Sequence, residues 1–98
     1  MRLNWFNRLI YKLRGRDPMA EYLAWLIQFG RIAEGRILDF NHDDSMTTIF
    51  FRYNVANVDY ETSQKLTPEQ IKRAHQYIPG AVVSVRYDPK NPGSSLVT

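Results

Sequence analysis

The sequence predicts an α+β fold: two N-terminal helices, then a small antiparallel β-barrel or sandwich-like sheet of about five strands with one helix inserted at residues 67–77. Three observations predict it. The hydrophobic period is helical up to residue 30 and becomes two beyond it. A strong helix-start signal interrupts the strand pattern near residue 67. The length of 98 residues allows a single folded unit, which we divide into residues 1–30 and 31–98.

The first predicted helix, residues 3–14, is amphipathic and basic. Residues 1–16 hold five Lys or Arg and no acid, whereas residues 17–98 hold eight bases against ten acids. The net charge of +3 is therefore +5 on the N-terminal segment and −2 on the remainder. Its apolar residues share one helical face, and the candidate membrane or partner surface comprises Trp5, Phe6, Arg8, Leu9, Ile10, Lys12 and Leu13.

Two main interpretations of this segment stay open. Its apolar face packs on the protein's own core or on a second copy of the chain, or it inserts into a membrane interface while the cations meet anionic headgroups. Contact with nucleic acid is a third, weaker interpretation, because the charge is confined to one end rather than spread over the domain.

The second predicted helix covers residues 18–30. Asp17 is a suitable N-cap, Pro18 fits the first turn, and Gly30 marks the end. This apolar run is shorter than the roughly 20 residues that a membrane-spanning helix needs. Basic and apolar residues are interleaved at the start of the chain, which does not fit a signal peptide. We expect a protein that is cytoplasmic or peripheral on the cytoplasmic face of the membrane, and not secreted.

The strands follow from alternation and turn residues. Residues 31–40 predict a strand in which Gly35 marks a bulge or a close backbone approach. Residues 41–45 predict a polar turn, and residues 46–55 alternate cleanly with Ile49, Phe51, Tyr53 and Val55 on one face. Ala56 and Asn57 predict a two-residue hairpin turn. The strand at residues 58–63 then returns with Val58, Tyr60 and Thr62 inward.

The inserted helix at residues 67–77 has a full start signal. Thr67 as N-cap, Pro68 and Gln70 predict a capping box, and its apolar face comprises Ile71, Ala74, His75 and Ile78. Pro79 and Gly80 end the helix. Residues 81–87 predict a strand, residues 88–93 a dense turn, and residues 94–97 a short last strand.

Residues 31–97 resemble the domain-of-unknown-function 3592 family. The resemblance is carried by Gly35-Arg36-Ile37, by Phe51-Arg52-Tyr53-Asn54-Val55 with Tyr60, and by the late stretch Pro79, Gly80, Val83, Val85, Tyr87, Asp88, Pro89, Asn91 and Pro92. This chain has Ala56-Asn57 where a glycine is common and a helix at residues 67–77 where a loop is expected. The resemblance implies a compact β-barrel-like or sandwich-like module associated with the envelope or a membrane surface, and implies no reaction.

Candidate catalytic chemistry is sparse. The chain has no Cys, which excludes a disulfide scaffold, a zinc ribbon and a cysteine nucleophile. His42, Asp43 and Asp44 are interpreted as a solvated turn rather than a metal site, and His75 as a histidine at the edge of the core. No nucleophile elbow, phosphate-binding glycine loop or HExxH pair occurs. We therefore expect no enzyme, no cofactor and no metal site.

Phe50 and Arg52 form a possible ligand face on the outward side of the central strand. An aromatic ring beside a cation can stack a nucleobase, although we expect an N-terminal helix to cover this pair. The leading functional expectation is a non-enzymatic interaction module that is membrane-peripheral or self-associating through its apolar helices. The alternative is a small β-barrel that binds nucleic acid through Phe50, Arg52 and the basic segment.

Overall fold

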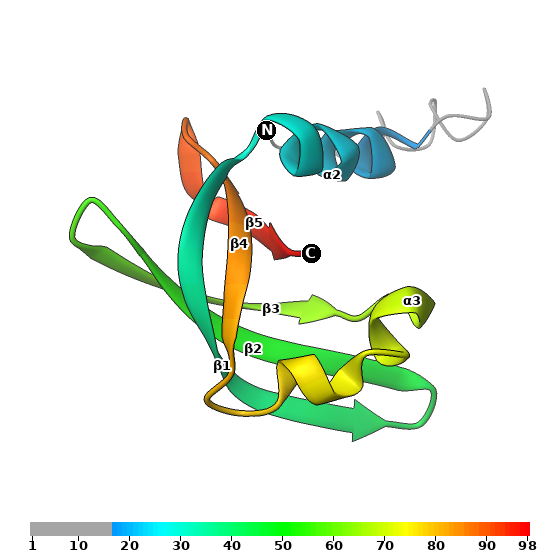
Figure 1. The fold of residues 1–98 in the computed structure, drawn as a ribbon. Helices are drawn as coiled ribbons and strands as arrows, with labels where there is room; N and C mark the ends of the chain where they lie inside the picture. Colours follow the sequence, from blue (N-terminus) through cyan, green and yellow to red (C-terminus); the bar gives the residue numbers. More distant parts are fainter. Residues whose placement is uncertain (1–16) are drawn as a thin grey trace.

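The computed structural model describes residues 17–98 and shows one helix followed by a five-stranded antiparallel sheet (Figure 1). In chain order the elements are α2 (Pro18–Phe29), β1 (Arg31–Asp43), β2 (Met46–Val55), β3 (Val58–Lys65), α3 (Pro68–Ile71), the 3-10 helix η1 (Ala74–Tyr77), β4 (Val82–Asp88) and β5 (Asn91–Val97). The α+β class and the five-stranded sheet are confirmed. The first predicted helix, residues 3–14, lies outside the described residues.

Helix α2 has the ends that its sequence predicts. The Asp17 carboxylate accepts a hydrogen bond from the Met19 N–H at 3.0 Å, and Pro18 occupies the first turn. The Gly30 N–H donates to the Leu26 carbonyl at 2.8 Å. A Cβ at Gly30 would overlap that carbonyl oxygen. Glycine therefore lets the chain leave the helix and enter β1 within one residue.

Strand β1 is the central strand of the sheet, whose order is β3-β2-β1-β4-β5. Its first half pairs with β4, from Arg31 opposite Tyr87 to Arg36 opposite Val82. Its second half pairs with β2, and the register shifts between Ile37 and Asp39. This bulge bends the strand so that one strand serves two partners.

Gly35 permits the close approach that was one of its two predicted roles. A Cβ at this position would lie 2.6 Å from Val85 Cγ2 and 3.1 Å from the Arg52 carbonyl oxygen. The bulge itself falls three residues later, at Leu38.

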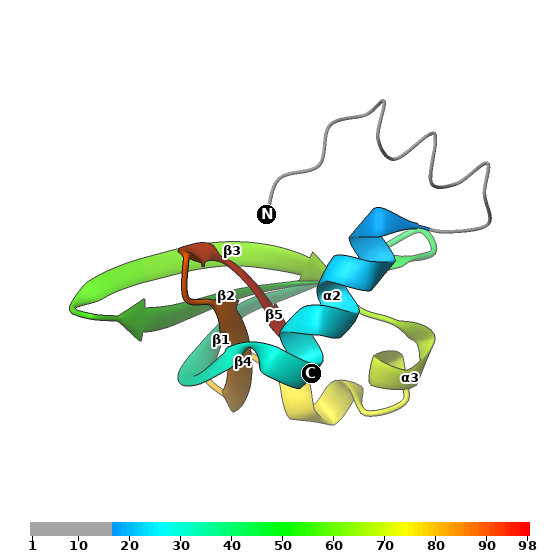
Figure 2. The ribbon, with the colours of Figure 1, turned by 90° about the horizontal axis from the view of Figure 1, so that it is seen from above.

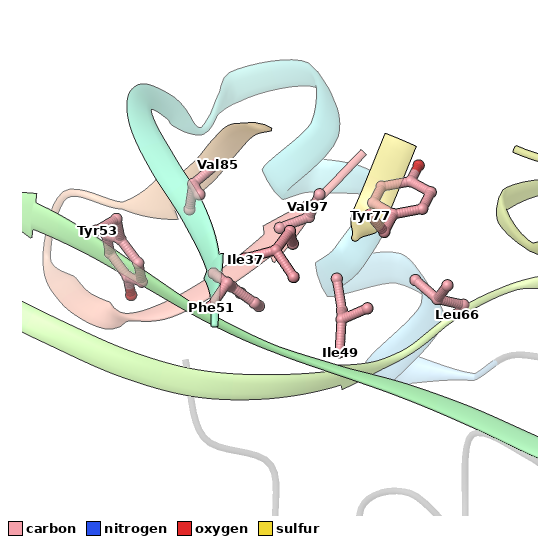
Figure 3. Close-up of a cluster of buried hydrophobic side chains, with 8 residues drawn as sticks. All are labelled: Ile37, Ile49, Phe51, Tyr53, Leu66, Tyr77, Val85 and Val97. Atoms are coloured by element: carbon pink, nitrogen blue, oxygen red, sulfur yellow. The ribbon is translucent and has the colours of Figure 1, made fainter. Parts of the chain in front are cut away.

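The core lies on the inner face of the sheet, and the predicted alternation of β2 is confirmed. In β3 the inward Tyr60 and Thr62 are half-buried, but Val58, which was also predicted to point inward, is 50% exposed at the hairpin end. In β2, Ile49, Phe51 and Tyr53 are buried while Phe50, Arg52 and Asn54 are exposed. Eight residues form the main cluster, which extends from Tyr53 at one end to Leu66 and Tyr77 at the other (Figure 3): Ile37, Ile49, Phe51, Tyr53, Leu66, Tyr77, Val85 and Val97.

The barrel is closed between β3 and β5 by side chains rather than by a ladder of backbone hydrogen bonds. The Gln64 amide donates to the Val97 carbonyl at 2.9 Å and accepts from the Val97 N–H at 2.7 Å. Tyr60 lies beside Gly93. Both pairs have a sequence separation of 33, so β3 and β5 run parallel. The strand order and this parallel seam are those of the five-stranded, partly open Greek-key barrel known as the OB type.

The inserted segment differs from the single helix predicted at residues 67–77, and that prediction was wrong. The capping box is present: the Gln70 N–H donates to Thr67 Oγ1 at 3.2 Å, and the Thr67 N–H to Gln70 Oε1 at 3.1 Å. After one turn the backbone leaves helical geometry at Arg73 and continues as η1. Before the break the Gln70 amide donates to the Val97 carbonyl at 2.8 Å, and after it Tyr77 lies in the core.

The predicted buried face of this segment was also wrong. Gln70 and Tyr77 are buried, whereas Ile71, His75 and Ile78 are exposed. Gln70 is buried although it is polar, because its side chain donates a hydrogen bond to the Val97 carbonyl of β5. His75 is therefore not a core-edge residue.

Two turns are shorter than predicted. Strand β1 continues to Asp43, so that only Asp44 and Ser45 form the turn. Strand β5 begins at Asn91 rather than Ser94, because Pro92 and Gly93 are tolerated in a strand at the edge of the sheet. The turn at Ala56 and Asn57 is confirmed, and both have the positive φ that such hairpins require.

Helix α2 packs against β4 and β5, away from the β2–β3 hairpin (Figures 1 and 2). Leu26 of the helix and Leu96 of β5 are buried, yet neither belongs to the main cluster. Since Leu96 is paired with Arg86, next to the inward Val85, it lies on the outer face of the sheet. The helix thus covers the outside of β4 and β5.

Candidate functional site: an exposed apolar helix

Most of the large apolar residues of α2 remain exposed. Only Pro18 and Leu26 are buried, and Tyr22 is half-buried. Trp25 is 40% exposed, Ile27 51% and Phe29 60%. We call the following residues the exposed α2 surface: Met19, Leu23, Trp25, Ile27 and Phe29. Five such residues on one twelve-residue helix exceed the scattered single exposures that are normal for a monomer.

The aromatic residues of α2 form a continuous row. The Tyr22 and Trp25 rings stack with centroids 6.2 Å apart, and the Trp25 and Phe29 rings are tilted at the same separation. The row begins at the half-buried Tyr22 and ends at the exposed Phe29. One edge of the helix therefore presents a preformed aromatic surface.

A hydrogen bond across 66 positions attaches α2 to the sheet. The Tyr22 hydroxyl donates to Asp88 Oδ2 at 2.9 Å. Burial, and then the bond to Asp88, raises the pKa of Tyr22 above its ordinary value. The hydrogen bond from the Lys90 N–H, at 2.9 Å, lowers the pKa of Asp88, against an opposing effect of burial and with help from Tyr22. The ionised carboxylate thus binds both the turn and the helix.

The Tyr-Asp-Pro-x-Asn-Pro stretch, residues 87–92, makes intramolecular hydrogen bonds of the kind that its turn chemistry predicts. Asp88 closes the two-residue turn at Pro89 and Lys90, and the Asn91 amide donates to Ser94 Oγ at 2.9 Å. The Tyr53 hydroxyl donates to the Pro92 carbonyl. These bonds of Asp88, Asn91 and the Pro92 carbonyl fix the turn between β4 and β5 and attach it to the core and to α2.

Phe50 and Arg52 are both exposed on the outer face of β2. The expectation that an N-terminal helix covers them is wrong for α2, because that helix packs on β4 and β5. Arg52 pairs with Glu61 at 3.5 Å on the neighbouring strand. It also lies opposite Arg36, a like-charged arrangement that the sequence pattern did not reveal. The two guanidinium groups border an open depression of about 300 Å³.

The histidines and acids that were considered for catalysis are dispersed. His42 Nδ1 lies 2.7 Å from Thr47 Oγ1, and Asp43 and Asp44 are exposed beside it. His75 lies elsewhere, on the exposed side of η1. Within residues 17–98, no group of three His, Cys, Asp or Glu side chains could hold a metal ion. The same part of the chain contains no helix with the length and hydropathy needed to cross a membrane.

The candidate surface of the N-terminal segment lies outside the described residues. It comprises Trp5, Phe6, Arg8, Leu9, Ile10, Lys12 and Leu13. The segment ends directly before Asp17, the N-cap of α2.

The fold and these surfaces define a small β-barrel domain with an apolar helix on its outer side. The chain belongs to the family described as "Domain of unknown function (DUF3592)", whose profile matches residues 30–98. The match begins at Gly30, where α2 ends, and contains all five strands. No curated protein and no solved structure matches the chain.

Proposed function

We propose that this protein is a non-enzymatic interaction module that binds the anionic surface of a membrane through residues 1–16, on its cytoplasmic face. The observation that carries the proposal is the exposed α2 surface, which directly follows a segment of charge +5. Tryptophan and phenylalanine are suited to the boundary between headgroups and acyl chains, and cations beside them attract anionic lipid.

The charge distribution supports a membrane rather than a uniformly polyanionic partner. Residues 17–98 carry a net charge of −2, so an anionic membrane attracts residues 1–16 and not the rest of the protein. Each cation near an anionic bilayer contributes about 1 kcal/mol. Five such residues, with apolar insertion, are sufficient for reversible binding without a spanning helix.

Flotation of the full chain with vesicles tests the proposal. We expect binding to mixed phosphatidylserine and phosphatidylcholine vesicles, weak binding to pure phosphatidylcholine, and a blue shift of tryptophan fluorescence on binding. Neutralising two cations, Arg8→Gln with Lys12→Gln, removes about 2 kcal/mol and weakens binding roughly 30-fold.

A matched variant, Lys65→Gln with Lys72→Gln, neutralises two exposed lysines of the sheet domain. We expect it to bind vesicles like the wild type. Wild-type protein that stays in the soluble fraction with anionic vesicles at low salt would refute the proposal, as would equal losses in the two double variants.

A nucleic-acid-binding barrel is the second candidate, and the strand order favours it. In OB-type barrels the face of strands 2 and 3 binds oligonucleotides, and Phe50 and Arg52 lie on this face. The acids Asp39, Asp59 and Glu61 project from the same face as the bases Arg36, Arg52 and Lys65, so this face has no excess of positive charge to attract phosphate. We therefore rank it second. Salt-sensitive retention on single-stranded DNA that Arg52→Ala weakens would reverse this order.

A further inference from the structure

Helix α2 has an outward face distinct from its aromatic edge. At about 100° per residue, four apolar residues lie within one arc that points away from the half-buried Tyr22 and the buried Leu26: Ala20, Leu23, Ala24 and Ile27. All four are exposed. Their spacing of i, i+3, i+4 and i+7 is that of a helix-packing seam. Trp25 and Phe29 lie outside this arc, so a membrane can use the aromatic edge while the outward face stays free.

The outward face is complementary to itself. In an antiparallel pair of α2 helices with a two-fold axis between positions 23 and 24, Ala20 lies opposite the partner helix's position 27 and Leu23 opposite its position 24. Every layer then sets a small residue against a large one, which allows close packing without a gap. Such self-complementarity is the requirement of an isologous two-fold interface, and an unrelated partner would have no need of it.

Charge and length agree with this pairing. None of the four residues is charged, so the contact buries no ion. A twelve-residue helix is about 18 Å long, and a single helix pair of that length falls in the class of interfaces below about 1,200 Å², which are weak and transient.

We propose that the outward face of α2 binds the same face of a second copy of this chain in a weak, two-fold, antiparallel helix pair. The dimer carries two basic N-terminal segments. Their joint binding to one surface raises the apparent affinity without any new contact. The inference goes beyond the membrane proposal and is tested in the absence of lipid, so that either can fail alone.

Sedimentation equilibrium of the full chain from low micromolar to millimolar concentration gives the first test. We expect reversible growth toward twice the monomer mass. Leu23→Glu with Ile27→Glu should weaken association at least about tenfold, because pairing would then bury carboxylates. Glutamate is a good helix former, so α2 is retained. Val58→Glu at the β2–β3 hairpin replaces an equally exposed residue, 50% against 51% for Ile27, and should leave association unchanged.

Cysteine cross-linking tests the geometry. The chain has no cysteine, so Ala24→Cys introduces one thiol beside the predicted axis and Ser63→Cys one on the outer face of β3. Mild oxidation should give a covalent dimer of the first variant much faster than of the second. A monomer at all concentrations, equal cross-linking of both variants, or an Ala24→Cys thiol shielded from a maleimide within the monomer would overturn the proposal. The last result would instead assign the outward face to residues 3–14 of the same chain.

Discussion

The side chain of Gln64 replaces a missing backbone pairing, and its removal should open the seam between β3 and β5. Its amide makes two hydrogen bonds with the Val97 backbone, at 2.9 Å and 2.7 Å. Val97 is 1% exposed, so water cannot replace them. We consider the substitution Gln64→Ala.

The magnitude follows from counting the groups that lose partners. The Val97 carbonyl still accepts from Gln70 at 2.8 Å, whereas the Val97 N–H is left buried and unpaired. Each lost hydrogen bond costs about 1 kcal/mol, and an unpaired buried donor about 1–3 kcal/mol. We expect a loss of about 2–4 kcal/mol of unfolding free energy. For a domain of this size that lowers the Tm by roughly 10–30 °C.

Urea and thermal denaturation of the full chain measure this loss. Gln76→Ala, at an exposed glutamine of η1, is the matched control and should change stability by less than about 0.5 kcal/mol. If Gln64→Ala unfolds at the same urea concentration as the control, the side-chain closure of the barrel contributes nothing and the reasoning is refuted.

A second substitution at the same position gives a pH signature that simple loss of packing would not produce. In Gln64→Glu the ionised carboxylate accepts from the Val97 N–H but opposes the Val97 carbonyl, whereas the protonated acid can donate to it. The folded state therefore favours the neutral acid and raises its pKa. Compared with wild type at the same pH, the variant should be destabilised at neutral pH and recover as the pH falls toward about 4.

Three further predictions concern the backbone, acid stability and the inserted segment. Gly35→Ala should cost about 1–3 kcal/mol in urea denaturation, because its Cβ would meet Val85 and the Arg52 carbonyl, whereas Gly93→Ala, with 3.7 Å to Tyr60, should be close to neutral. The lowered pKa of Asp88 means that its contribution is present above its unfolded pKa and is lost as the pH falls through the folded value. Wild-type protein should therefore lose stability below about pH 4. The denaturation midpoint of Asp88→Asn should fall less steeply as the pH decreases, and an equal dependence on pH in the two proteins would contradict this assignment. Thr67→Ala removes the capping box and should lower stability by about 0.5–2 kcal/mol by thermal melting, with Thr98→Ala as the control that should not.

The sequence was most informative where local chemistry alone decides the structure. Asp17 and Gly30 give the ends of α2, and the alternation from Met46 to Val55 gives β2 with its buried face. The hairpin at Ala56 and Asn57 likewise depends on neighbouring residues only. These features need no knowledge of what lies across the molecule.

The misplaced features depend on distant partners. The helix predicted at residues 67–77 breaks because Gln70 bonds Val97 and Tyr77 enters the core, neither of which hydrophobic spacing can show. The pairing of Tyr22 with Asp88 and of Arg36 with Arg52 required the register of the sheet. For the contact between Tyr22 and Asp88, the sequence offered one indication, which is a tyrosine within an apolar helix.

Helix α2 has a surplus of apolar residues beyond those that its packing on the sheet uses. Covering the outer side of β4 and β5 uses Pro18, Tyr22 and Leu26, and Tyr22 alone supplies the polar attachment. A helix that served only as a cover would be polar at positions 23, 25, 27 and 29, since exposed apolar residues favour association. The surplus divides by direction into an aromatic edge and a self-complementary outward face. On the two proposals above, a membrane contacts the aromatic edge and a second copy contacts the outward face, so substitutions at Trp25 and Ile27 should separate lipid binding from self-association.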